Sequence, residues 1–169
     1  MNLEIHESDM CFGPFPPAAI FHMEVSPIVV SLRPSVKMVE FVWRKGEGAG
    51  QQLIFVEAKS SIPRHEEKLA DFMGAVRDKF SNAVSLLLAL CLGRHGDVHG
   101  NSVPESFKGA FIASAQVKFV LVVKGVPPEF LPPFNEQLQK YCKVVSKLFR
   151  VTAVAVVNET GARKMGLIQ

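Results

Sequence analysis

The feature that most constrains the fold is a continuous apolar run, Leu53–Val56, inside the stretch QQLIFVEAKSSIPR at residues 51–64. An uninterrupted run of this kind is typical of a strand that is buried on both faces, which requires a covering layer on each side of the sheet. The strand then continues into Glu57 and Lys59. Charged side chains at the end of a buried strand cost free energy unless they are paired or bind an ion.

Strand-like and helix-like segments alternate along the rest of the chain. Apolar residues at three- and four-residue steps predict the clearest element, a long helix. A strand–helix–strand order that occurs twice implies crossover connections, so we predict an α/β fold: one domain over residues 1–169, with a mixed β-sheet flanked by helices. The expected elements are a strand at 1–6, a helix at 26–33, a hairpin of strands at 36–46 and 51–61, the long helix at 65–94, a loop at 95–109, a strand at 115–125, a helix at 127–150, a strand at 151–159 and a C-terminal tail, with 7–25 unassigned.

Composition narrows the class of protein. With 169 residues, 48% of them hydrophobic, the chain can build one sizeable core. Its longest apolar stretch, AVSLLLALCL, is shorter than the roughly 20 residues of a membrane span, and the acidic N-terminus does not resemble a signal peptide. We therefore expect a soluble cytoplasmic protein with no membrane partner. Cys11, Cys91 and Cys142 lack metal-type spacing and are expected to be buried free thiols.

Charge and short motifs exclude some functions and leave others open. A net charge of +3 permits an anionic partner without indicating one. The sequence contains no Walker loop, no GxGxxG and no GxSxG, so it offers no support for a nucleotide hydrolase or an α/β-hydrolase. His95, Asp97 and His99, in a glycine-flanked loop, could bind a transition metal, although a solvated loop is the simpler interpretation.

Two carboxylates and a lysine are expected to meet at one edge of the sheet. Because side chains alternate along a strand, Glu57 and Lys59 share one face of their strand. Glu40 lies in an apolar row of the preceding strand, and the hairpin can bring it beside Glu57. Paired carboxylates repel unless a cation neutralises them, and such oxygen ligands suit Mg²⁺. A neighbouring lysine can orient a water molecule and stabilise negative charge on a phosphate.

This pattern resembles the PD-(D/E)xK nuclease superfamily, with its restriction-endonuclease-like fold. The residues that carry the resemblance are in VEFVWRKGEGAGQQLIFVEAKSS, followed by the long helix and by AQVKFVLVVKG, a core of about residues 24–125. The resemblance implies that Glu40 and Glu57 bind Mg²⁺ (or Mn²⁺) and that Lys59 positions the attacking water. Two departures are that a glutamate replaces the family's aspartate and that Val39, not proline, precedes it.

Further site residues follow from the same resemblance. Many members of the superfamily carry a glutamate before the first core strand, and Glu24 is the candidate here, with Glu7 behind it. Arg64 and Lys68, at the start of the long helix, would bind substrate phosphates, with Lys79 further along the same helix. A basic helix start is equally compatible with plain solvation.

The sequence thus leaves three functions open. The first is a magnesium-dependent nuclease acting on DNA, expected as a homodimer through the helix at 134–149 or the C-terminal tail. The second is a nucleic-acid-binding or assembly module on the same fold that no longer cuts. In the third, Glu57 and Lys59 are an ordinary ion pair at a strand end. If Glu40 and Glu57 repel each other in the metal-free protein, replacing either with alanine should leave its melting temperature unchanged or raise it.

Overall fold

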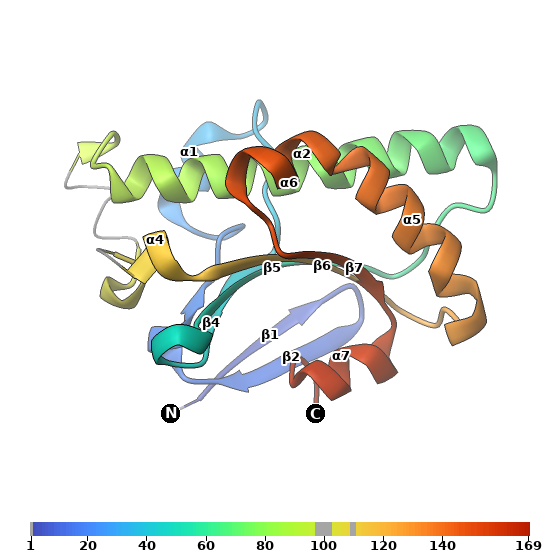
Figure 1. Ribbon diagram of the computed structural model, residues 1–169, viewed down its shortest axis with the longest axis horizontal. Helices are drawn as coiled ribbons and strands as arrows, with labels where there is room; N and C mark the ends of the chain where they lie inside the picture. Colours follow the sequence, from blue (N-terminus) through green and yellow to red (C-terminus); the bar gives the residue numbers. More distant parts are fainter. Residues whose placement is uncertain (1, 97–102, 109–110) are drawn as a thin grey trace.

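The chain forms an α/β domain in three layers around a mixed sheet, as the alternating pattern predicts. Figure 1 shows a computed structural model, which describes residues 2–96, 103–108 and 111–169. Five strands form the middle layer in the order β3-β4-β5-β6-β7. β3, β4 and β5 are antiparallel neighbours, while β5, β6 and β7 run parallel. The strands are β1 (Leu3–Glu7), β2 (Met10–Phe15), β3 (Ile20–Phe21), β4 (Phe41–Lys45), β5 (Gln52–Lys59), β6 (Gln116–Val123) and β7 (Ala153–Val157).

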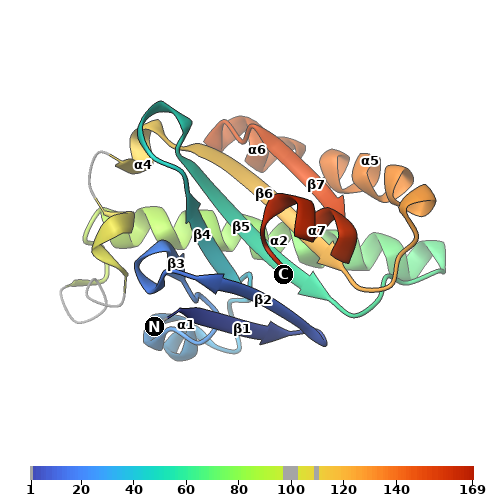
Figure 2. The ribbon, with the colours of Figure 1, turned by 90° about the horizontal axis from the view of Figure 1, so that it is seen from below.

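Helices cover one face of the sheet, and a hairpin with one helix covers the other. In Figure 1, α1, α2, α5 and α6 lie above the sheet, and the β1–β2 hairpin and α7 lie below it. Figure 2 shows the hairpin and α7 side by side against the lower face. The helices are α1 (Pro27–Leu32), α2 (Glu66–Cys91), α4 (Phe111–Ser114), α5 (Leu131–Tyr141), α6 (Lys143–Phe149) and α7 (Glu159–Met165), with short 3-10 turns at Pro17–Ala19, Gly48–Gly50, Glu105–Phe107 and Pro128–Phe130.

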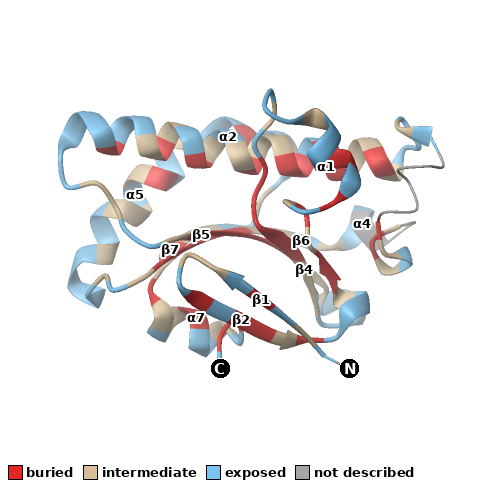
Figure 3. Ribbon diagram, turned by 180° about the vertical axis from the view of Figure 1, so that it is seen from behind, coloured by how far each residue is buried: buried red, intermediate tan, exposed pale blue. Residues whose placement is uncertain are grey.

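The apolar run of β5 is buried on both faces, which confirms the first expectation. Leu53 and Phe55 belong to the core under α2, whereas Ile54 and Val56 belong to the core under the hairpin. Phe80 of α2 stacks on a ring of β6 at 4.6 Å between centroids. Figure 3 shows the buried residues concentrated in the sheet and along the inner side of α2. Burying each large apolar side chain contributes about 1.5–3 kcal/mol, so this strand is held firmly where its charged end begins.

Two expectations for the C-terminal third are wrong. The helix expected at 127–150 is two helices, because α5 ends at Tyr141 and α6 begins at Lys143. The expected C-terminal tail is the helix α7, which Asn158 caps by accepting a hydrogen bond from the Gly161 N–H at 3.0 Å. α7 ends at Gly166, whose φ of +79° favours glycine. Asparagine before and glycine after a short segment are helix signals that the apolar pattern alone does not show.

The other differences lie where periodicity is weakest. The unassigned segment 7–25 contains β2 and β3, and α4 follows the expected loop. Of the three free cysteines, Cys142 is buried and Cys91 is half-buried, but Cys11 is exposed, because it points outward from the hairpin. Within the described residues, no helix is both long and apolar enough to span a bilayer.

Candidate functional site

The two acidic residues of the motif lie close together at one edge of the β4–β5 pair, with Glu40 directly before β4 and Glu57 near the end of β5. Phe41 pairs with Val56 in the antiparallel register, and the Glu40 N–H donates to the Val56 carbonyl at 3.1 Å. One residue further, Glu40 therefore faces Glu57 on the side of the sheet that α2 covers. Both side chains are buried, with 4% of Glu40 and 0% of Glu57 exposed. The hairpin thus brings the two carboxylates together at the end of a buried strand.

Two lysine ammonium groups neutralise Glu57. Nζ of Lys59 lies 2.6 Å from Oε1 of Glu57, and Nζ of Lys79, from α2, lies 2.7 Å from the same oxygen. Nζ of Lys79 also lies 3.7 Å from Oε1 of Glu40. The cation between the two carboxylates is therefore a side chain of this chain. Lys79 already balances the charges of Glu40 and Glu57 in the metal-free protein. Removing either acid therefore does not relieve an unopposed repulsion, which was the reason to expect an unchanged or raised melting temperature.

Lys79 is a central site residue that the motif does not contain. It lies three residues after Val76 and four before Ala83, both buried, so it occupies the apolar face of α2. A lysine in that position needs a partner as much as a glutamate in a buried strand does. This interruption of the apolar stripe is the sequence signal that identifies it.

Glu24 and Glu7 extend the acidic cluster. Carboxylate oxygens of Glu7, Glu24 and Glu40 lie within 4.8 Å of one another. Arg33, at the end of α1, donates from Nη2 to the Glu24 backbone carbonyl at 2.9 Å and lies 3.3 Å from its Oε1. The structure therefore places the expected additional acid, Glu24, next to Glu40, and Glu7 beside both.

A cavity of about 450 Å³ opens beside these carboxylates. Its charged lining consists of Glu24, Arg33, Lys37, Lys59 and Lys79. Arg33 is paired with Glu24, and Lys59 and Lys79 are paired with Glu57. Four cationic side chains against these two carboxylates still leave a positive balance, which favours an anion. Arg33 and Lys37 were not among the expected site residues, because nothing in the local pattern links residues 33–37 to the end of β5.

Burial controls the protonation of the cluster. Desolvation raises the pKa of Glu40 to about 9, and a hydrogen bond with Glu24 and the charge of Glu57 act in the same direction. The same hydrogen bond lowers the pKa of Glu24. Burial alone would lower the pKa of Lys79, but Glu57 and Glu40 raise it above the ordinary lysine value. At neutral pH, Glu40 therefore holds a proton while Glu24 is ionised and Lys79 is charged.

The raised pKa of Glu40 predicts a pH-dependent stability in EDTA. The unfolded chain releases this proton near pH 4.5 and the folded protein only near pH 9, so the folded state binds more protons between those values. Stability from this group is complete below pH 4.5 and falls as pH rises, by up to about 1.4 kcal/mol per pH unit. We expect Glu40→Gln, which keeps a donor toward Glu24, to lose less stability than wild type between pH 5 and 9. Parallel slopes in urea unfolding of the two proteins would contradict this.

The expected phosphate-binding residues lie apart from the carboxylates. Arg64 and Lys68 are both exposed. Lys68 is in the first turn of α2, and about 16 Å of helix axis separates it from Lys79 at 1.5 Å per residue. Arg64 and Lys68 therefore lie apart from the carboxylate cluster, and their binding of substrate phosphates stays a prediction. Of the possible transition-metal ligands, Asp97 and His99 lie outside the described residues.

The carboxylates retain free capacity for a cation. Oε2 of Glu40 and Oε2 of Glu57 are buried, and no donor in the described part of the chain reaches either atom. A buried carboxylate oxygen without a donor is costly, and a hard divalent cation is one group that would satisfy it. At Glu40 such an ion would replace the proton that burial retains at neutral pH. The donor set of Glu7, Glu24, Glu40 and Glu57 consists only of oxygens, which fits Mg²⁺ or Mn²⁺.

Similarity to known proteins does not bear on this site. Comparisons of the chain with protein-family models, with curated proteins and with solved structures give no match.

Proposed function

We propose that this protein is a metal-dependent nuclease that hydrolyses phosphodiester bonds of DNA, on a restriction-endonuclease-like core. The observation that supports it most strongly is the convergence of Glu40, just before β4, and Glu57, near the end of β5, on Lys79, with Lys59 at 2.6 Å from Glu57. The element order agrees with the PD-(D/E)xK resemblance, because the antiparallel pair β4–β5 is followed by α2 and then by the parallel strand β6.

The site residues would have separate roles in hydrolysis. Glu40 and Glu57 would hold Mg²⁺ or Mn²⁺, with Glu24 as an additional ligand. The bound ion would act as a Lewis acid toward the reacting phosphate. Lys59, which has 32% of its side chain exposed and lines the cavity, would position the attacking water and stabilise the negative charge that develops on the phosphate.

The basic lining of the cavity supports a phosphate-containing substrate. Arg33 and Lys37 line the cavity together with Lys59, where they would contact phosphates next to the one that is cleaved. Arg64 and Lys68 would contact the DNA backbone further along, by charge and not by base recognition.

The cytoplasmic location and the homodimer stay predictions. In the helix region expected at the dimer contact, Val144 and Leu148 are 69% and 73% exposed.

One observation favours a second candidate, a non-catalytic nucleic-acid-binding or assembly module on the same fold. Lys79 lies between the two carboxylates, at 2.7 Å from Glu57 and 3.7 Å from Glu40. A built-in ammonium balances the acids without any metal, so the cluster is consistent with a structural charge network. The two candidates share the basic cavity and differ in whether a divalent ion enters.

Cleavage assays separate the two candidates. We expect metal-stripped protein to cut supercoiled plasmid or single-stranded DNA when Mg²⁺ or Mn²⁺ is added, and not in EDTA. Glu57→Gln should abolish the activity, while Glu66→Gln, an exposed glutamate at the start of α2, should retain it as a matched control. Absence of cleavage on all these substrates would favour the binding module, which gel-shift measurements would then detect. Equal cleavage by Glu57→Gln would contradict the assigned site.

A further inference from the structure

A second group of metal-ligating side chains lies on the outer face of the β1–β2 hairpin, away from the carboxylate cluster. The hairpin turns at Ser8 and Asp9, whose φ values of 51° and 58° belong to a tight two-residue turn. The inward side chains, including Ile5 and Phe12, are buried under the sheet. This packing holds the outward side chains in a fixed register.

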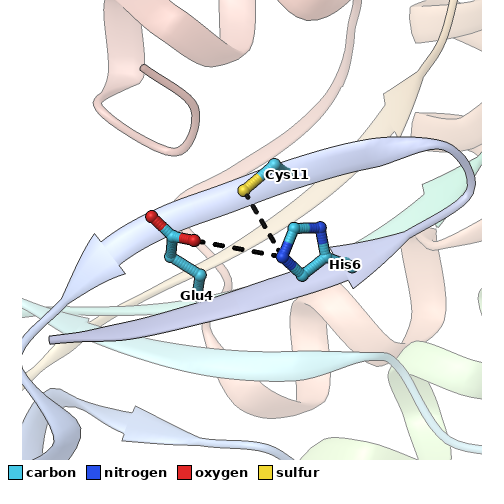
Figure 4. A group of neighbouring side chains, drawn as sticks. All are labelled: Glu4, His6 and Cys11. Atoms are coloured by element: carbon cyan, nitrogen blue, oxygen red, sulfur yellow. Dashed lines mark hydrogen bonds and ion pairs between the residues drawn. The ribbon is translucent and has the colours of Figure 1, made fainter.

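Two of these outward residues, Glu4 and Cys11, converge on one nitrogen atom of a third, His6. His6 and Cys11 are direct cross-strand partners, and Glu4 lies two residues before His6 on the same face. Figure 4 shows Cys11 and Glu4 both pointing toward the His6 ring. Nε2 of His6 lies 4.0 Å from Sγ of Cys11 and 3.9 Å from Oε2 of Glu4. All three side chains are exposed, so an ion can reach them without rearrangement of the core.

We propose that Glu4, His6 and Cys11 form a binding site for a thiophilic divalent metal ion such as Zn²⁺. A thiolate, an imidazole and a carboxylate are the donors that Zn²⁺ takes, at about 2.3 Å for sulfur and about 2.0–2.2 Å for nitrogen and oxygen. Tetrahedral ligation at these lengths puts ligand atoms about 3.4–3.6 Å apart. The two separations that involve His6 therefore need to close by about half an ångström, and the ligand atoms of Glu4 and Cys11 start within 4.8 Å of each other, which side-chain rotation can close.

The surroundings leave room for the remaining coordination positions. Glu4 and Cys11 line a cavity of about 360 Å³ next to the C-terminal helix, with Lys124 and Arg163 among its other residues. Three protein ligands beside an open cavity are typical of a Zn²⁺ site that keeps a position for water or a small anion. The site does not depend on the proposed nuclease activity, because its residues and its preferred metal both differ from those of the carboxylate cluster.

Cobalt substitution tests this site directly, because Co²⁺ bound to a thiolate absorbs in the near ultraviolet. We expect metal-free protein to develop this band with one equivalent of Co²⁺ and to lose it when Zn²⁺ is added. Cys11→Ser should abolish the band, and His6→Ala should weaken binding by more than about 100-fold, since even an outer partner of a ligand is worth about 10–100-fold. Both residues are exposed, so these variants should fold as wild type does.

Two controls make the result specific. Cys91→Ser should keep the band, because Cys91 is half-buried in α2 and donates to the Phe107 carbonyl at 3.3 Å. Glu57→Gln should also keep it, which separates this site from the carboxylate cluster. No thiolate band at one equivalent, or a band that survives Cys11→Ser, would overturn the proposal while leaving the nuclease proposal untouched.

Discussion

Glu57→Ala is expected to lower the free energy of unfolding in EDTA by about 3–5 kcal/mol, the usual cost of removing one partner from a buried ion pair. Glu57 is fully buried, and its Oε1 forms an ion pair with Lys59 at 2.6 Å and accepts a hydrogen bond from Lys79 at 2.7 Å. Lys59 can turn toward water, since 32% of its side chain is exposed, but Lys79 is only 14% exposed. The variant therefore leaves a largely buried ammonium with Glu40 as its remaining acidic neighbour. Urea unfolding measures the loss.

The double variant Glu57→Ala/Lys79→Met is the matched control. Removing both charges leaves no buried ammonium without a partner, so the double variant should be more stable than Glu57→Ala alone. The coupling free energy between the two positions should reach about 1–3 kcal/mol. An unchanged or raised melting temperature in Glu57→Ala would contradict the ion-pair network. It would instead support repulsion between Glu40 and Glu57, which the sequence alone suggests.

The sheet and its long helix could be predicted because their residues follow strong periodicities. The apolar run of β5 requires two covering layers, and the stripe of α2 supplies one of them. The second layer could not be predicted, because it is a hairpin and a short helix whose segments show weaker patterns. β2 contains glycine and proline within six residues, and α7 has only seven residues, so neither presents a full apolar stripe.

Only the site residues that lie in one hairpin could be predicted from the sequence. The residues between Glu40 and Glu57 form a single hairpin. Strand alternation and a short loop are therefore enough to predict that the two side chains lie close together. The contact of Lys79 with Glu57 crosses from a helix to a strand and depends on how the helix is rotated and placed over the sheet. Arg33 and Lys37 reach the cavity from the irregular chain after α1, which no periodicity describes.

The two lysines differ in what they contact, although both bind the same oxygen. Lys79 reaches Glu40 as well as Glu57, so it lies where a shared divalent cation would balance both acids. Among the described residues, Lys59 forms an ion pair with Glu57 alone, and it is the more exposed of the two lysines. On the proposed function, a divalent ion that entered the cluster would compete with Lys79, whereas Lys59 would remain beside the cavity. On the proposed function, Lys59 would therefore carry the chemistry, and Lys79 would balance the charge of the metal-free protein.

Lys59→Met is expected to lower the rate of metal-dependent DNA cleavage by about 10²–10³-fold, the usual cost of removing one group that stabilises developing negative charge. Methionine keeps the length of the side chain and removes only the ammonium group. Mn²⁺ affinity should change little, because Glu40 and Glu57 remain and Lys79 still balances them in the metal-free protein. Single-turnover cleavage measures the rate, and titration calorimetry in the absence of DNA measures Mn²⁺ binding.

Lys79→Met is the matched control, because it removes the same charge from the same carboxylate oxygen. Here Mn²⁺ no longer has to displace an ammonium from Glu57 and Glu40, so its affinity should rise about tenfold, which is about 1.4 kcal/mol of additional stabilisation at saturating metal. Cleavage should be retained. Loss of cleavage in Lys79→Met with activity kept in Lys59→Met would reverse the two roles. Equal Mn²⁺ affinity in Lys79→Met and wild type would show that Lys79 does not compete with the metal. Absence of Mn²⁺ binding in all three proteins would mean that the carboxylates hold no metal and that the lysines serve only to balance their charge.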